Sequence, residues 1–156
     1  MQVNPDHQTG ATVHGTLVAL GSDGVLLRGP SGSGKSDLAL RLIMPPSPWS
    51  LVSDDQVVLS RDRERITGRA PMPIAGKLEV RGIGIVQWPA REAAVIGLIV
   101  DLVPRPDVPR MPELGHRADL LGLAIPCIRL HAFDASTPAK IALLLSETIR
   151  AATDKI

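Results

Sequence analysis

A glycine-rich segment that ends in lysine and serine carries the clearest chemical signal in this sequence. Residues 29–36 match the pattern G-x-x-x-x-G-K-[ST] of a phosphate-binding loop. The glycines let the backbone form a nest of N–H donors, and the start of a following helix adds the positive end of its dipole. Lys35 would then reach the β- and γ-phosphates of a nucleotide, and the Ser36 hydroxyl would take a Mg²⁺ coordination position. The expected phosphate-binding residues are Gly29, Pro30, Ser31, Gly32, Ser33, Gly34, Lys35 and Ser36.

Two adjacent aspartates form the second candidate. Asp54 and Asp55 lie 19 and 20 residues after Lys35, so one short helix would return the chain to a strand that ends beside the loop. One carboxylate would be a general base, accepting a hydroxyl proton as that oxygen attacks the γ-phosphorus, and the other would help to hold the metal ion. Aspartates also favour turns, so the pair by itself fits a structural role equally well. The neighbouring phosphate loop is what favours catalysis.

Other polar positions give weaker signals on their own. Glu79 and Arg81 stand two apart in an apparent strand, which is typical of an exposed pair worth about 0 to 1 kcal/mol. Gly82 and Gly84, directly after them, would permit close backbone approach or a bulge. His14 lies between strand residues and, taken alone, fits a packed or surface group better than a catalyst.

The elements that would position these residues follow from short apolar runs and the turn residues between them. Strands are expected at 12–20 and 24–29, separated by a Gly-Ser-Asp-Gly turn. Apolar residues at spacings of three and four predict a helix at 37–44, directly after the glycine-rich segment, and Pro45 would end it. Strand, glycine loop, helix and strand in this order make a βα unit.

The remaining chain predicts more strands and one more helix. Prolines crowd residues 104–112, which predicts an extended mobile loop. An apolar stripe predicts a C-terminal helix at 138–150, with Ser136 or Thr137 as its N-cap. Further strands are expected at 50–60 (interrupted by the two aspartates), 66–70, 78–86, 93–103 and 124–130.

Length and composition fit one domain. The chain has 156 residues, of which 44% are hydrophobic, enough for one core built from Leu, Ile, Val and Ala. We expect a flexible N-terminus at 1–11, a single P-loop catalytic domain at 12–150 and a tail at 151–156. The 17 basic and 16 acidic side chains nearly cancel and aromatics make up only 2%, so the composition disfavours nucleic acid as a partner.

The compartment is also indicated by composition. A single cysteine, Cys127, excludes an internal disulfide and a multi-cysteine zinc site, and its apolar neighbours suggest a buried thiol in a reducing compartment. The N-terminal residues do not resemble a signal peptide. The longest apolar run, 93–103, is far shorter than the roughly 18 to 20 residues of a membrane span. We therefore expect a cytoplasmic protein with no membrane partner.

Taken in order, these segments resemble the catalytic domain of bacterial HPr kinase/phosphorylase. That P-loop family phosphorylates a serine of HPr, the carrier protein of the sugar phosphotransferase system. The resemblance covers residues 12–130 and includes VHGTLVAL, GVLLRGPSGSGKSDLAL, LVSDDQVVL, TGRAP, LEVRGIGIV and LLGLAIPCIRL. A histidine 21 residues before the loop lysine, an Asp-Asp pair after it and an E-[IV]-R-G-[LI]-G-I strand form a much rarer combination than a P-loop alone. The implied fold is α/β, with a mainly β core, a P-loop helix and a C-terminal helix.

The resemblance also implies roles for the candidate residues. Lys35 would contact nucleotide phosphates, and Ser36 and Glu79 would bind Mg²⁺, in addition to the metal role that the residues themselves suggest for Asp54. Asp55 would be the base for the serine hydroxyl and the acid in the reverse direction.

Two further residues match the family less tightly. His14 resembles its active-site histidine. Arg110 resembles a catalytic arginine on a mobile loop, where a cation would suit charge on the transferred phosphoryl group.

The implied substrates and partners are ATP, Mg²⁺ and HPr or an HPr-like carrier. Members of the family also run in reverse with inorganic phosphate, releasing pyrophosphate, and full-length members form hexamers, so a homo-oligomer is expected. Two features depart from the family: its usual N-terminal domain has no counterpart here, and its Pro-Val-x-x-Gly-Arg-Asn stretch, associated with dephosphorylation, is replaced by LHAFDASTP. The kinase direction is therefore the better supported expectation.

Two other functions remain open from the residues alone. A small-molecule kinase would use the same phosphate loop with a lid, which the proline-rich loop with Arg105 and Arg110 could imitate. A nucleotide-dependent regulatory module would bind ATP without transferring phosphate.

Overall fold

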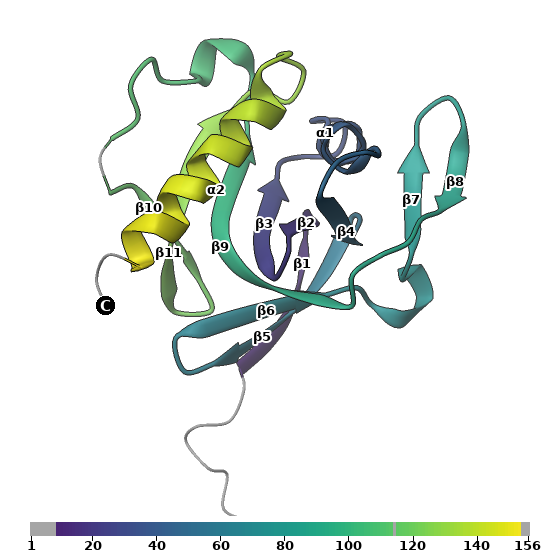
Figure 1. Ribbon diagram of the computed structural model, residues 1–156, viewed down its shortest axis with the longest axis horizontal. Coiled ribbons are helices and arrows are strands. Elements are labelled where there is room, and N and C mark those ends of the chain that lie inside the picture. Colours follow the sequence, from purple (N-terminus) through teal and green to yellow (C-terminus); the bar gives the residue numbers. More distant parts are fainter. Residues whose placement is uncertain (1–8, 114, 154–156) are drawn as a thin grey trace, which may run out of the picture.

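A curved mixed sheet with two helices on one face forms the centre of the molecule (Figure 1). The computed structural model describes residues 9–113 and 115–153. The order along the main sheet is β1-β5-β6-β9-β3-β2-β4, and β11 joins β9 with β10 outside it. The bounds of these strands are β1 Thr9–His14, β2 Thr16–Leu20, β3 Asp23–Arg28, β4 Trp49–Ser53, β5 Gln56–Asp62, β6 Arg65–Arg69, β9 Ala93–Leu102, β10 Arg117–Leu120 and β11 Leu123–Leu130.

The carboxyl ends of four strands meet at one edge of this sheet. Strand β9 runs parallel to both β3 and β11. Strand β2 is antiparallel to β3 and to β4, so β4 points the same way as β3. In open sheets with parallel strands, ligands bind beyond these carboxyl ends. This edge carries the loop at 29–34, Asp54 and Asp55, and the loops that follow β9 and β11.

The sheet separates two hydrophobic clusters, because successive strand side chains point to opposite faces. Val18, Val25 and Leu27 face the helices, whereas Leu17 and Leu26 face the strands that curl round from the other side. The helices are α1, Lys35–Ile43, and α2, Thr137–Thr153. Burial on both faces fixes the central strands, which in turn fix where their carboxyl ends stand. The predicted α/β fold with a mainly β core is confirmed.

Helix α1 begins where the phosphate-loop pattern ends. Gly34 precedes it with φ 97°, a conformation that glycine adopts without the cost of a Cβ. Its buried face comprises Lys35, Leu38, Ala39, Leu42 and Ile43, which matches the predicted periodicity over 37–44. At the start of α2, the Thr137 hydroxyl donates to the His131 carbonyl oxygen at 2.6 Å. This helix runs three residues beyond the predicted end at 150.

The first predicted strand, 12–20, is instead two strands with an earlier start. Strand β1 already pairs with β5 at Thr9, where residues 9–11 were expected to be flexible. The break falls at Gly15, where a Cβ would come within 3.0 Å of the Leu27 carbonyl oxygen. Such a close approach between backbones explains the glycine and the turn of the chain from one strand partner to another. Residues 1–8 and 154–156 of the predicted termini lie outside the described residues.

The predicted strand at 78–86 is also wrong, because this segment is a hairpin. Strands β7, Lys77–Val80, and β8, Gly84–Gln87, pair with each other in a separate two-stranded sheet (Figure 1). Gly82 and Gly84 have φ 89° and 115°, which produces the turn. Arg81 therefore lies in the turn and does not share a strand face with Glu79.

The remaining differences concern short elements. Strand β10 pairs with β11 and was not predicted, since its four residues lack a clear apolar alternation. The 3₁₀ turns are η1, Met72–Ile74, and η2, Arg105–Asp107, the second lying within the proline-rich loop. No helix in the described part of the chain has the length and apolar character needed to cross a membrane.

Candidate active site

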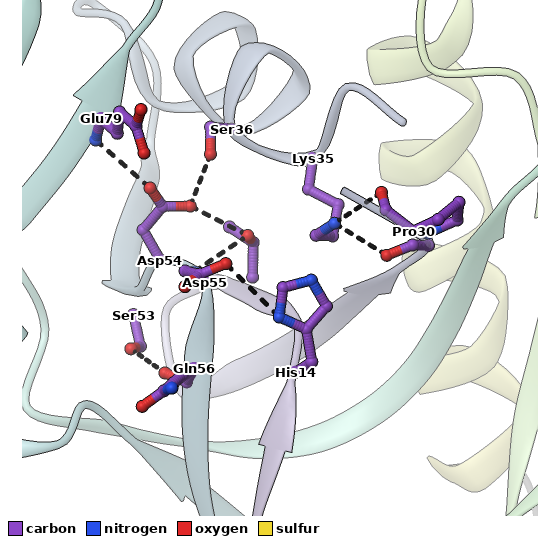
Figure 2. A network of polar contacts seen from close by, with 11 residues as sticks. His14, Pro30, Lys35, Ser36, Ser53, Asp54, Asp55, Gln56 and Glu79 are labelled. Atoms are coloured by element: carbon purple, nitrogen blue, oxygen red, sulfur yellow. Dashed lines mark hydrogen bonds and ion pairs between the residues drawn. The ribbon is translucent and has the colours of Figure 1, made fainter. Parts of the chain in front are cut away.

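The phosphate loop wraps around the end of its own lysine (Figure 2). Lys35 is 7% exposed, and its Nζ donates to the carbonyl oxygens of Gly29 at 2.7 Å and Pro30 at 3.0 Å. The first turn of α1 follows at once, so N–H groups that have no acceptor within the helix face outward beside this ammonium. Loop and helix start together provide positive charge and hydrogen-bond donors, the chemistry that an anionic phosphate chain requires.

Burial lowers the pKa of the Lys35 ammonium, while the charges of Asp55 and Asp54 act in the opposite direction. The charged form of a lysine in these surroundings is stabilised when a further anion approaches, because the partly dehydrated ammonium then acquires a charged partner. Its two carbonyl acceptors are neutral, so a phosphate oxygen is the stronger partner for the same donor.

Asp54 is a buried acid that organises three elements. It is 5% exposed, and its Oδ1 accepts from the hydroxyls of Thr16 at 3.0 Å and Ser36 at 2.7 Å. Its Oδ2 accepts from the backbone N–H of Glu79 at 3.2 Å. The carboxylate thus ties β2, the start of α1 and β7 together, and Figure 2 shows it between Ser36 and Glu79. These bonds offset the cost of burying its charge.

Asp55, the next residue, has the opposite environment. Its side chain is 66% exposed and lies 3.4 Å from His14, measured from Oδ1 to Nδ1. Its φ is 71°, in the left-handed region that aspartate tolerates better than most residues. The Gly15 N–H donates to the Asp55 carbonyl oxygen at 2.9 Å, which holds the backbone in this turn. The result is an acid presented to solvent by a fixed backbone, with a histidine beside it.

Glu79 reaches the site because β7, the strand that carries it, packs on the hydrophobic core. Its neighbour Leu78 is fully buried in the core cluster that also contains residues of α1. Alternation along β7 therefore turns the Glu79 side chain outward, where it lines the same cavity as Ser36. This position brings a second carboxylate to the rim of the phosphate loop.

A cavity of about 450 Å³ joins these features. Phosphate-loop residues form one wall, and Asp55 and the β7–β8 hairpin form another. The lining residues are Ser31, Gly32, Gly34, Lys35, Ser36, Asp37, Leu40, Asp55, Glu79, Val80, Arg81 and Phe133. The volume lies in the range of small-molecule and cofactor sites.

Most of the sequence-predicted residues meet here. Lys35, Ser36, Asp55 and Glu79 line the cavity, and Asp54 lies directly beneath it. Arg110 does not: it is exposed in the loop after β9 and is absent from the cavity lining.

Within the glycine-rich segment, residues contribute in two ways. Ser31, Gly32 and Gly34 line the cavity, whereas Gly29 and Pro30 turn their carbonyl oxygens to Lys35. Ser33 does not line the cavity but packs under the loop, where its Oγ would lie 2.5 Å from a Cβ at position 29. Glycine at 29 is therefore required by packing.

Two residues of the site, Thr16 and Phe133, carried no usable sequence signal, and Arg81 gave only a weak one. Thr16 is a buried hydroxyl in an apolar strand, and only the structure shows that it donates to Asp54. Arg81 enters the lining because the hairpin turns where a continuous strand was expected. Phe133 is the only phenylalanine in the chain, and its place beside the phosphate loop depends on the loop after β11.

The oxygen atoms around Ser36 are the available metal donors. No group of three or more His, Cys, Asp or Glu side chains within residues 9–113 and 115–153 is arranged to hold a metal. A cation site would instead combine the Ser36 hydroxyl with acidic side chains and with oxygens of a bound phosphate chain. Such an all-oxygen set is the kind that Mg²⁺ prefers.

Comparison with known proteins bears on this site. A family model described as the HPr serine kinase C-terminal domain matches residues 7–144. The HPr kinase/phosphorylases of Burkholderia lata and Burkholderia cenocepacia are each 35% identical over 150 residues, covering 90% of this chain and 45% of the relative. The chain thus spans about half the length of these relatives.

One solved structure, the Hpr(Ser) kinase/phosphatase from Coxiella burnetii, matches the fold. The TM-score is 0.75 at 23% identity, and the match covers 93% of each chain. The glycine loop, the paired aspartates and the Glu-Val-Arg-Gly hairpin all lie inside the span of the family model. This chain belongs to the HPr serine kinase C-terminal domain family.

Proposed function

We propose that this chain is an ATP- and Mg²⁺-dependent protein kinase that phosphorylates a serine of HPr or an HPr-like carrier. The observation that carries the proposal is the placement of Asp55, an exposed acid in the same cavity as Lys35 and Ser36. A hydroxyl on an incoming protein can reach such an acid, whereas it could not reach the buried Asp54. The names of the full-length relatives supply the acceptor.

The residues present fit a magnesium–nucleotide complex. The Ser36 hydroxyl donates its proton to Asp54, so its oxygen directs lone pairs towards the cavity, where a cation can use them. Glu79 offers a second oxygen ligand from the hairpin. When bound, Mg²⁺ neutralises negative charge on the phosphates and on the transferred group. Asp54 acts from beneath by fixing the Ser36 hydroxyl and the Glu79 backbone.

The chemical step is one proton transfer and one phosphoryl transfer. Asp55 accepts the serine hydroxyl proton on a carboxylate oxygen as the serine oxygen bonds to the γ-phosphorus, and the bond from that phosphorus to the β–γ bridging oxygen breaks. Lys35 and the loop N–H groups hold the negative charge that stays on the departing diphosphate. The protein's main contributions are position and electrostatics, since no covalent enzyme intermediate is required.

His14 and Arg110 have supporting roles in this proposal. The imidazole of His14, 3.4 Å from Asp55, limits the directions in which that carboxylate can turn. Arg110 would approach the transferred group only through a movement of the loop after β9. Asp55 would serve as the acid in the reverse reaction with inorganic phosphate. We also propose a cytoplasmic location and a homo-oligomer, a hexamer by family resemblance.

The test is phosphorylation of purified HPr with ATP labelled at the γ-position and Mg²⁺. We expect label on a serine of HPr, identified by mass spectrometry of its peptides, and no label when Mg²⁺ is chelated. A parallel screen with small-molecule acceptors separates this from a metabolite kinase. Transfer to a metabolite with none to HPr, or nucleotide binding with no transfer at all, would contradict the proposal.

A further inference from the structure

An exposed aromatic ring stands at the side of the phosphate loop that the proposed chemistry does not use. Phe133 is 55% exposed and lines the cavity. A Cβ added at Gly34 would lie 2.8 Å from its Cζ, so the ring sits directly over the glycine that precedes α1. An exposed ring in a chain with one phenylalanine, two tryptophans and no tyrosine calls for an explanation.

The backbone on both sides of Phe133 is held in place. Arg41, from α1, donates through Nη2 to the Ala132 carbonyl oxygen and through Nη1 to the Asp134 carbonyl oxygen at 3.3 Å. Arg105, from the loop after β9, donates to Oδ1 of Asp134 at 2.6 Å through Nη2 and at 2.9 Å through Nε. Two other segments of the chain, α1 and the loop after β9, therefore hold a loop whose central side chain remains open to solvent.

Within the described part of the chain, the Phe133 ring has a ring contact with His131. His131 lies edge-on to Phe133, with centroids 5.8 Å apart and planes at 69°. The His131 Nδ1 lies 3.0 Å from the Val103 carbonyl oxygen, which restrains the imidazole in turn. A side chain with so few rotational choices loses little entropy when a flat ligand packs on it.

The strand order places the Phe133 ring on the opposite side of the phosphate loop from Asp55, the proposed base for the incoming serine. Strand β3, which leads into the phosphate loop, lies between β4 on one side and β9 and β11 on the other. Asp55 follows β4 and Phe133 follows β11. A phosphate chain on the loop with its γ end towards Asp55 therefore directs its other end, the nucleoside, towards Phe133.

We infer that Phe133 is the platform on which the nucleobase of the phosphate donor stacks, so that the site selects a nucleoside triphosphate over an inorganic polyphosphate. The inference rests on the proposed use of ATP and concerns donor binding alone, without any acceptor. Stacking suits this position because it needs only a flat apolar ring next to the positively charged phosphate loop. It contributes to binding only when a base is attached to the phosphates.

The experiment compares two ligands on four proteins by isothermal titration calorimetry with Mg²⁺. The ligands are ATP and tripolyphosphate, and the proteins are the unaltered chain, Phe133→Ala, Phe133→Tyr and Leu143→Ala. Leu143 is a matched control, since it is 61% exposed on α2 and outside the cavity lining. We expect Phe133→Ala to weaken ATP binding about tenfold and to leave tripolyphosphate binding unchanged. Phe133→Tyr and Leu143→Ala should bind both ligands as the unaltered chain does.

Several outcomes would overturn the inference. Equal weakening of both ligands would mean that Phe133 supports only the shape of the loop. Unchanged ATP binding in Phe133→Ala, or an unaltered chain that binds ATP no better than tripolyphosphate, would mean that no base contacts the ring. Failure of the proposed function looks different: ATP binding that depends on Phe133 would persist, while HPr would remain unlabelled.

Discussion

Two polar clusters stand at the same edge of the sheet and have opposite characters. One is the centre after β4, with Asp54, Asp55 and Ser36. The other joins the neighbouring strands β3, β9 and β11, where Arg28 donates to both carboxylate oxygens of Asp101 at 2.8 and 3.0 Å. The thiol of Cys127 adds a third contact to Asp101 at 3.3 Å. Both clusters place a carboxylate at or beyond the end of a strand. Asp55 and Ser36 of the first cluster line the cavity, whereas Arg28, Asp101 and Cys127 are not among its lining residues.

The difference lies in how the charges are paired. Burial acts to raise the pKa of Asp101, but the hydrogen bonds from Arg28 and Cys127 and the charge of Arg28 outweigh it, so the pKa is lowered overall. The Arg28 pKa is raised by the hydrogen bond to Asp101, against the effect of burial. We call this group the closed cluster, because the charges of Arg28 and Asp101 are paired with each other. Its contacts join three strands. Around Lys35, by contrast, one acid is exposed, and the hydrogen-bond acceptors of the ammonium are neutral carbonyl oxygens. A bound phosphate can therefore act as a charged partner of this ammonium.

The largest test of this comparison is Asp55→Asn. Asparagine keeps the shape and tolerates φ 71°, so the fold should be retained, but it cannot accept the serine proton as a carboxylate does. We expect phosphorylation of HPr to fall by about 10² to 10⁴-fold, equivalent to about 3 to 5 kcal/mol in the barrier. The rate constant under saturating ATP and HPr is the measurement. Asp62→Asn, at an exposed position at the end of β5, is the control and should be fully active. An active Asp55→Asn variant would place the base elsewhere.

The second test asks whether Asp54 stabilises the fold through its hydrogen bonds, as Asp101 does, in contrast to the exposed Asp55. Asp54→Asn removes the charge and sets an amide against one of the three donors that the carboxylate now satisfies. We expect the free energy of unfolding to fall by about 1 to 3 kcal/mol, measured by urea denaturation. Thr16→Val removes one donor and keeps the charge, so its effect should be smaller. Unfolding of Asp54→Asn at the same urea concentration as the unaltered chain would show that these bonds contribute nothing.

The sequence predicted this centre better than it predicted the surroundings. The glycine motif fixes Lys35 and Ser36 on a loop between a strand and a helix, and a single short helix brings the chain back to Asp54; these are local consequences of spacing. Arg81 and Phe133 depend on a turn at two positive-φ glycines and on a loop fixed by distant arginines. Periodicity cannot supply such contacts, because apolar runs on either side of a turn look like one strand. The sequence does not predict the different burial of Asp54 and Asp55 for the same reason. Burial of Asp54 depends on distant contacts with Thr16 and with the N–H of Glu79.

The third test addresses the closed cluster. Asp101→Asn should lower the free energy of unfolding by about 1 to 2 kcal/mol near neutral pH, a figure that allows for the partial exposure of the Arg28–Asp101 pair. Because the pKa of Asp101 is lowered by folding, its stabilisation is present above its ordinary value near 3.8 and is lost as the pH falls further. Urea denaturation at pH 7 and pH 3.5 should thus show a smaller difference between variant and unaltered chain at the lower pH. ATP binding should be unchanged at pH 7, and a large loss there would mean that the clusters are coupled.

The smallest test concerns the thiol of the closed cluster. Burial, together with the charge and the hydrogen bond of Asp101, raises the pKa of Cys127 from near 9 to about 11. The unfolded chain then releases the thiol proton first, so the unaltered protein should lose about 1 kcal/mol of unfolding free energy by pH 10, a loss that begins near pH 9 and ends near pH 11. Cys127→Ser keeps a donor for Asp101 but does not titrate in this range, so denaturation at pH 7.5 and pH 10 should show less alkaline loss. Lysines titrate in both proteins and cancel in the comparison. An equal loss would mean that the thiol ionises freely, and the cluster would then be open to solvent in the manner of Asp55.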